Sequence, residues 1–175
     1  MAASEPGRTH RQRRENTKRF GYGCLPSTMV KDRLDDGTRI AQLVASEVTG
    51  DRDHLVDHVV TDAEPDVEPT TDGAQAYRVV RVGNDDALVT DDRGRPTLDD
   101  EAGDAATTEM ATVYVHPDRA RIEFGRGPGA AAKAAEASKL RVQRAADESP
   151  QTTVFVEDGA EAKRVLTVFA AVATA

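Results

Sequence analysis

A glycine-rich turn holds the residues best suited to bind a charged ligand. Residues 125–130 read G-R-G-P-G-A, which fits the pattern G-x-G-x-x-(G/A) between a predicted strand and a predicted helix. Backbone N–H groups at a helix start can bind phosphate, with Arg126 alongside, and Asp147 or Glu148 lies about 20 residues on, where a ribose-binding acid is expected. Fewer than 50 residues follow the motif, too few to complete a dinucleotide-binding sheet. The pattern therefore predicts at most an anion site, made of Gly125, Arg126, Gly127 and Gly129; the alternative is a plain glycine-rich connection.

Two histidines in an acidic segment are candidate metal ligands. His54 and His58 are four positions apart, with Asp53 and Asp57 beside them. On a helix, residues at i and i+4 share a face, and imidazole with carboxylate suits a divalent metal. The β-rich residues around them favour a strand instead, on which the two histidines lie farther apart. Solvated histidines on an acidic surface are the alternative interpretation.

Arginines on predicted strands form a third candidate site. The set consists of Arg78, Arg81, Arg119 and Arg121. If their strands pair, these side chains would form a basic stripe able to contact the phosphates of a nucleic acid. The alternative is that each arginine pairs with a carboxylate on a neighbouring strand.

The sequence offers little for catalysis. His116 and Asp118 are a possible acid–base pair, but Pro117 between them is typical of a solvent-exposed turn. No serine lies in a G-x-S-x-G motif. We therefore name no catalytic residue and no cofactor.

The charge composition indicates a salty environment. The chain has 175 residues, with 19 Asp and 12 Glu but only 5 Lys, and a net charge of −8. Such a surface repels itself and destabilises the compact state, and molar salt shortens the Debye length to about 3 Å, which removes that penalty. The composition predicts an extreme halophile's protein, and an ordinary acidic protein is the alternative.

The first 28 residues differ from the rest. They carry a net charge of +4, whereas residues 29–175 carry −12. This change favours a translation start at Met29; if residues 1–28 are translated, they are expected to be a disordered basic extension. Cys24 is the only cysteine, so neither an intrachain disulfide nor a cysteine zinc site can form. Because no apolar run is long enough to span a membrane and no signal-peptide core is present, we expect a cytoplasmic protein with no membrane contact.

Several segments resemble a family of short uncharacterised haloarchaeal proteins. They are M-V-K-D-R-L-D-D-G-T-R-I-A-Q-L-V-A-S-E from Met29, then Y-R-V, V-H-P-D-R-A-R-I-E-F and V-F-V-E-D-G-A-E-A-K-R. The resemblance covers most of residues 29–175 and implies a halophilic host and a late start. The family has no assigned activity, so the resemblance implies no functional residues.

Hydrophobic periodicity predicts a single α+β domain over residues 29–175. Helices are expected at 35–49, at 129–138 and after the capping-box pair Asp158 and Glu161; strands are expected at 55–62, 75–82, 87–91, 111–115, 119–124, 140–144 and 153–157. Residues 75–82 and 87–91 should form a hairpin, and the acidic segment of about 92–109 should be a disordered loop. The similar strings at 129–133 and 159–163, each after a proposed hairpin, suggest a duplication that would place both following helices on one face of the sheet.

The resulting fold is an N-terminal helix, a mainly antiparallel sheet of about five to seven strands, and two later helices on one face. Such a sheet with one covered face offers a surface for association. The favoured function is therefore a non-catalytic module that binds a protein partner or itself. The alternatives are a nucleic-acid accessory protein that uses the arginines, which the charge of −12 disfavours, and a small-anion or nucleotide-binding protein at the Gly125–Ala130 turn.

Overall fold

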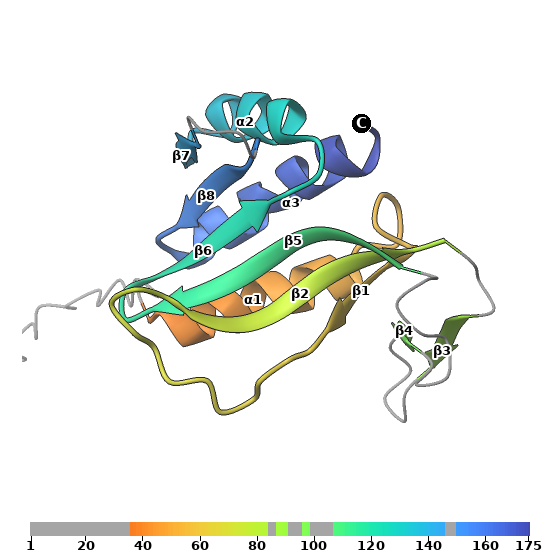
Figure 1. The fold of residues 1–175 in the computed structure, drawn as a ribbon, viewed down its shortest axis with the longest axis horizontal. Coiled ribbons are helices and arrows are strands. Elements are labelled where there is room, and N and C mark those ends of the chain that lie inside the picture. The colour runs from red at the N-terminus through yellow and green to blue at the C-terminus, as the bar shows by residue number, and fades with distance from the viewer. Residues whose placement is uncertain (1–35, 84–86, 91–95, 99–106, 146–149) are drawn as a thin grey trace, which may run out of the picture. The chain divides into compact units, whose positions relative to one another are not determined.

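The computed structural model describes residues 36–83, 87–90, 96–98, 107–145 and 150–175, all within one compact unit of residues 32–175. The predicted basic extension at 1–28, with Cys24, lies outside these residues. The elements in chain order are α1 (Gly37–Gly50), β1 (His58–Thr61), β2 (Ala74–Val82), β3 (Leu88–Thr90), β4 (Pro96–Leu98), β5 (Thr107–His116), β6 (Arg119–Phe124), α2 (Pro128–Ala137), β7 (Arg141–Arg144), β8 (Thr152–Val156) and α3 (Gly159–Ala173) (Figure 1).

Six of the strands form one antiparallel sheet, in the order β1-β2-β5-β6-β8-β7. This sheet and the helices confirm the predicted α+β fold. The predicted hairpin of 75–82 with 87–91 is wrong, because β2 pairs with β1 and β5, whereas β3 pairs with β4 in a separate two-stranded sheet. Val79 and Val80 of β2 are buried on opposite faces, as suits a strand that lies between two others, β1 and β5, whereas Val89 of β3 is exposed.

The acidic segment at 92–109 contains two pieces of regular structure. Residues 96–98 form β4, and residues 107–109 begin β5. The other residues of this segment lie outside the described part of the chain. Strands β3 and β4 lie beside an apolar cluster of Val59, Val80, Val82 and Ala87, so this small sheet shields one end of β1 and β2.

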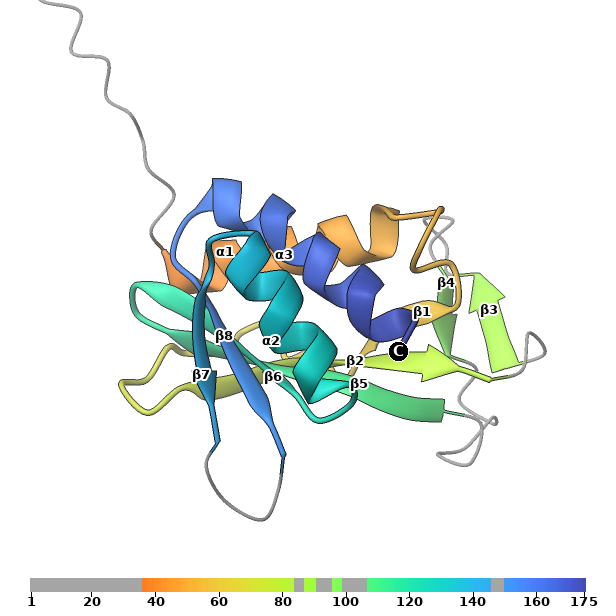
Figure 2. The ribbon, with the colours of Figure 1, turned by 90° about the horizontal axis from the view of Figure 1, so that it is seen from above.

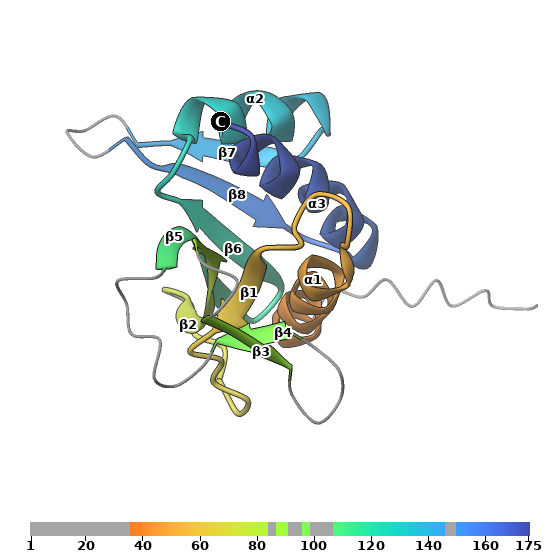
Figure 3. The same ribbon diagram turned by 90° about the vertical axis from the view of Figure 1, so that its right-hand side faces the viewer.

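The three helices of the described residues pack on the same face of the large sheet (Figure 2, Figure 3). Their apolar stripes meet the inward side chains of the strands in one core, in which Phe124 of β6 contacts Phe169 of α3 edge-on with 5.0 Å between ring centroids. The capping box of α3 is present: Asp158 accepts a hydrogen bond from the backbone N–H of Glu161, and the Glu161 side chain accepts one from the N–H of Glu157.

The last two helices each follow a pair of antiparallel strands. α2 follows β5 and β6, and α3 follows β7 and β8, while β6 pairs with β8 at the centre. Both helices lie on one face, which is the geometry that the proposed duplication requires (Figure 3). The sheet therefore keeps its other face free of helices over the described residues.

Candidate protein-binding face

The face of the sheet turned away from the helices carries Tyr114 and Phe155, together with Arg78, Arg119, Arg121 and Arg141. We call it the open face. Directly paired residues on antiparallel strands share a face, so the strand register orders these side chains in two rows across the sheet. The aromatic row consists of Gln75, Tyr114, Arg121, Phe155 and Arg141, and the threonine row consists of Arg78, Thr112, Glu123, Thr153 and Gln143.

The charged side chains of the open face keep part of their surface in solvent. Arg121 and Glu123 at the centre retain 24% and 25% of their side-chain exposure, and Arg141 at the edge retains 63%. By contrast, the opposite face of the same strand is sealed, since Ala120, Ile122 and Phe124 have no exposed surface. The alternation of polar and apolar residues along β6 thus gives the strand one solvated face and one buried face.

Two aromatic rings lie beneath arginines on this face. The guanidinium carbon of Arg121 lies 4.5 Å from the centre of the Tyr114 ring. Phe155 is covered by two arginines, with Arg141 at 4.7 Å and Arg119 at 5.7 Å from its ring centre. These cation–π contacts hold the planar guanidinium groups against the sheet.

The arginines predicted to form a basic stripe are divided between the two faces. Arg78, Arg119 and Arg121 lie on the open face, whereas Arg81 lies on the helix side, because Val80 and Val82 on either side of it point toward the β3–β4 sheet. All four pair with carboxylates: Arg78 with Asp62 and Glu109, Arg81 with Asp57, Arg119 with Asp118, and Arg121 with Glu123. Of these pairs, Arg78 with Glu109 joins neighbouring strands, as the alternative interpretation expects, whereas Arg119 pairs with the residue before it and Arg121 pairs within its own strand. Nucleic-acid binding stays a prediction.

Two arginine donors on the open face remain unused. The Nε atoms of Arg119 and Arg121 are buried and have no hydrogen-bond partner among the described residues. Nε of Arg121 is 3.3 Å from Oε1 of Glu123, close enough for an ion pair but not in hydrogen-bond geometry. Burial, followed by the charge of Glu123, raises the pKa of Tyr114, so its phenol is a neutral hydrogen-bond donor.

The predicted anion turn forms the start of α2. Gly127 is in the left-handed region at φ 54°, and no side chain caps the helix. Pro128 and Gly129 line a shallow hollow together with Arg144 and Thr152. Arg144 pairs with Glu136 at 2.6 Å, so its charge is already partly used. Asp147 and Glu148 lie outside the described residues, and anion binding at Gly125, Arg126, Gly127 and Gly129 stays a prediction.

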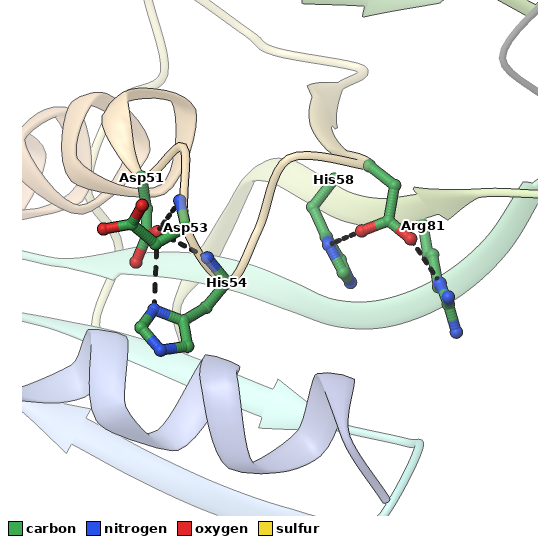
Figure 4. Close-up of polar contacts among 6 residues, drawn as sticks. Asp51, Asp53, His54, His58 and Arg81 are labelled. Atoms are coloured by element: carbon green, nitrogen blue, oxygen red, sulfur yellow. Dashed lines mark hydrogen bonds and ion pairs between the residues drawn. The ribbon is translucent and has the colours of Figure 1, made fainter.

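The structure separates the two histidines predicted to bind a metal (Figure 4). His54 lies in the turn after α1, exposed, with its ring 3.7 Å from Asp51. His58 begins β1, is 2% exposed and contacts Asp57. Across the part of the chain that the structure describes, no three His, Cys, Asp or Glu residues are arranged to hold a metal ion.

His116 and Asp118, the possible acid–base pair, contact different partners. Nδ1 of His116 is 3.0 Å from the carbonyl oxygen of Thr71, and the ring is buried, whereas Asp118 is exposed and pairs with Arg119. Burial lowers the pKa of His116, so its ring is neutral at ordinary pH.

The sequence interpretation missed Tyr114, Phe155 and Arg141 as residues of one surface. The signal was present in the alternation of their strands, since Tyr114 lies between inward-facing Val113 and Val115. Their assembly depends on the strand order, in which β8 lies next to β6 and β7 at the edge, and that order is not readable from periodicity.

The described residues form an α+β domain with three helices on one face of the large sheet, and with the β3–β4 sheet over the β1–β2 end of the other face. Residues 29–175 match the model of DUF7993, a family of unknown function, and the chain belongs to that family. No curated protein and no solved structure matches the chain. Among the described residues, none of the helices is both long enough and apolar enough to cross a membrane.

Proposed function

We propose that this protein is a non-catalytic module that binds a protein, either another chain or a copy of itself, through the open face. The observation that supports this proposal is the placement of Tyr114 and Phe155. Of the described aromatic residues, Tyr77, Phe124 and Phe169 are in the core, and these two lie on the open face under arginines. Tyrosine, phenylalanine and arginine are the residues enriched at protein interfaces, where they provide most of the binding energy.

The charge of the face favours a protein over a nucleic acid. Arg78, Arg119, Arg121 and Arg141 are matched by carboxylates that contact them, so the face has little net positive charge. Nucleic-acid binding depends on unpaired basic groups that replace counterions on phosphates. A protein surface can instead exchange hydrogen bonds with such paired groups while it covers the rings beneath them.

The working environment of the module follows from its composition. We propose the cytoplasm of a salt-adapted, haloarchaeal cell, because the acidic, lysine-poor sequence suits molar salt. Under such screening, association depends on contacts at short range, such as packing against the arginines that cover Tyr114 and Phe155, rather than on long-range attraction.

The test uses the full-length chain, tagged at the C-terminus and purified natively from a halophilic host in molar KCl. Native mass spectrometry should report a stoichiometric protein bound to the wild type. Tyr114→Ala should weaken that association at least about tenfold, as expected for an interface aromatic residue. Arg144→Ala is the matched control, since Arg144 is exposed and pairs with Glu136 of α2, away from the open face.

Two results would overturn this proposal. One is a bound nucleic acid that nuclease removes, or a bound small phosphate compound, in place of a protein. The other is a protein partner retained equally by wild type and by Tyr114→Ala, which would place the contact elsewhere on the chain.

A further inference from the structure

We infer that the partner of the open face is a second copy of this chain, bound face to face about a two-fold axis. This inference rests on the proposed function and names the partner of the same surface. Its basis is that the aromatic row and the threonine row are complementary in size and in charge when one copy is turned onto another.

The symmetry follows from the positions of the two rows. They run parallel to each other across β5, β6, β8 and β7, two residues apart on each strand. A two-fold axis that lies in the interface, midway between the rows and perpendicular to the strands, places the aromatic row of one copy over the threonine row of the other. Such contacts are isologous, and the two sheets then stack with their strands nearly aligned.

Side-chain size matches under this operation. Tyr114 is opposite Thr112 on the partner copy, and Phe155 is opposite Thr153, because each pair shares a strand and differs by two positions. Large residues thus meet small ones at both positions on each copy, as closely packed layers require. The same operation brings Arg141 opposite Gln143 at the sheet edge.

Charge also matches at the centre of the face. Arg121 and Glu123 lie on one strand, two residues apart, so the axis between them brings each Arg121 opposite Glu123 of the other copy. Within a single chain the contact of these residues is an ion pair without hydrogen-bond geometry, which leaves Nε of Arg121 unused. Two reciprocal pairs between copies would engage the part of each Arg121 guanidinium that remains exposed, since its side chain keeps 24% of its exposure.

The rest of the surface limits where copies can meet. The chain carries −8 overall, so contacts elsewhere on its surface more often bring like charges to within the short range that molar salt leaves unscreened. Within the two rows of the open face, no like charges face each other in the symmetric arrangement. This face is therefore a favourable place for two copies of an acidic chain to associate.

Charge reversal provides the test, with full-length protein in molar KCl and sedimentation velocity as the readout. The wild type should sediment as a species with twice the 18.8 kDa mass of one chain. Arg121→Glu and Glu123→Arg should each raise the dimer dissociation constant at least about tenfold, since each places like charges across the axis twice. Circular dichroism would confirm that both variants fold, and Arg144→Glu on the helix side should leave the dimer unchanged.

An equimolar mixture of the two charge-reversed variants separates the interface from effects within the chain. In a mixed dimer, both acidic groups at positions 121 and 123 of the Arg121→Glu chain face basic groups of the Glu123→Arg chain. The mixed dimer should therefore form with a lower dissociation constant than the dimer of either variant alone. Repulsion inside each chain is the same in the mixture, so a purely intrachain effect predicts no recovery. A mixture that stays monomeric, or single variants that dimerise like wild type, would overturn the inference.

Failure of this inference is distinguishable from failure of the proposed function. A wild-type monomer that binds a different protein, lost on Tyr114→Ala, would overturn self-association and leave the open face as a binding surface. A wild-type monomer that binds no protein in the native purification would overturn both.

Discussion

Nδ1 of the buried His58 lies 2.8 Å from Oδ1 of Asp57, the residue before it in the chain. The other oxygen of Asp57 accepts a hydrogen bond of 2.7 Å from Nε of Arg81, so the carboxylate stands between the two basic side chains (Figure 4). Burial alone would raise the pKa of Asp57, but the Arg81 hydrogen bond and the charge of His58 hold it below its ordinary value. Burial outweighs the attraction of Asp57 at His58 and lowers the pKa of that histidine.

The two buried histidines should make stability depend on pH. Burial lowers the pKa of both His58 and His116 from 6.5, so the folded chain takes up their protons at lower pH than the unfolded chain does. Their contribution to the free energy of unfolding is complete above pH 6.5 and decreases as the pH falls below that value. Denaturant midpoints measured at a series of pH values should therefore drop on the acid side.

Substitution assigns this dependence to a residue. His58→Gln should make the free energy of unfolding fall less steeply on the acid side. In the wild type the unfolded chain binds a proton at His58 at a pH where the folded chain does not, and the variant loses this difference. His54→Gln, the same substitution at a histidine that is 62% exposed, is the control and should keep the acid decrease, because His58 and His116 are intact. Equal slopes for His58→Gln and wild type would contradict the assignment.

Gly37 should be intolerant of any side chain. A Cβ atom there would lie 1.9 Å from the carbonyl oxygen of His116 and 2.6 Å from that of Arg119, both backbone atoms of the β5–β6 turn. Gly37→Ala must move α1 away from that turn, and we expect a loss of about 1–3 kcal/mol in the free energy of unfolding. Urea titration of both variants measures the effect. At Gly50, the other end of α1, an added Cβ atom meets nothing within 4 Å, so Gly50→Ala should leave the free energy of unfolding unchanged or raise it slightly.

The elements of the fold were predictable where local signals agree. The helix after Asp36 and the helix after Asp158 have caps and apolar stripes, and both are present. The tight turn at Pro117 likewise predicts the β5–β6 hairpin. Strand partners were not predictable in the same way, because β2 pairs with β5 over a sequence distance that periodicity does not report. Gly37 shows the same limit: its contact with the β5–β6 turn is tertiary, and the sequence alone suggests only a weak helix start.

The open face was predictable only in part. The alternation of Arg119, Arg121 and Glu123 indicates a wet face on one strand. The cover of Phe155 by arginines from β6 and β7 follows from the order β6-β8-β7, which brings together residues 119 and 141. The predicted arginine stripe does not form one surface. Arg78 and Arg81 are three positions apart on one strand, so their side chains point to opposite faces of the sheet.

The hydroxyl of Tyr77 should contribute to stability through one buried bond. It donates to the carbonyl oxygen of Ala41 in α1 at 2.7 Å and ties the helix to the sheet. Tyr77→Phe keeps the ring and removes this bond, so we expect a loss of about 1 kcal/mol. Tyr114→Phe, on the open face, should change the free energy of unfolding by less than half that amount. A similar loss for both variants in thermal denaturation would contradict the role given to the Tyr77 bond.

Salt should stabilise the fold strongly. The chain has 31 acidic and 23 basic residues, and its ion pairs are largely exposed, so each pair contributes little while the net repulsion acts over the whole surface. About 3 M KCl shortens the Debye length to below about 3 Å and should suppress that repulsion, whereas about 0.1 M KCl leaves it acting over about 10 Å. Refolding from urea should therefore be complete in the concentrated salt and incomplete in the dilute one, as followed by circular dichroism. Sodium chloride at matched ionic strength separates screening from an effect specific to potassium, because only the cation changes. Full refolding at low salt would show that the acidic surface needs no screening.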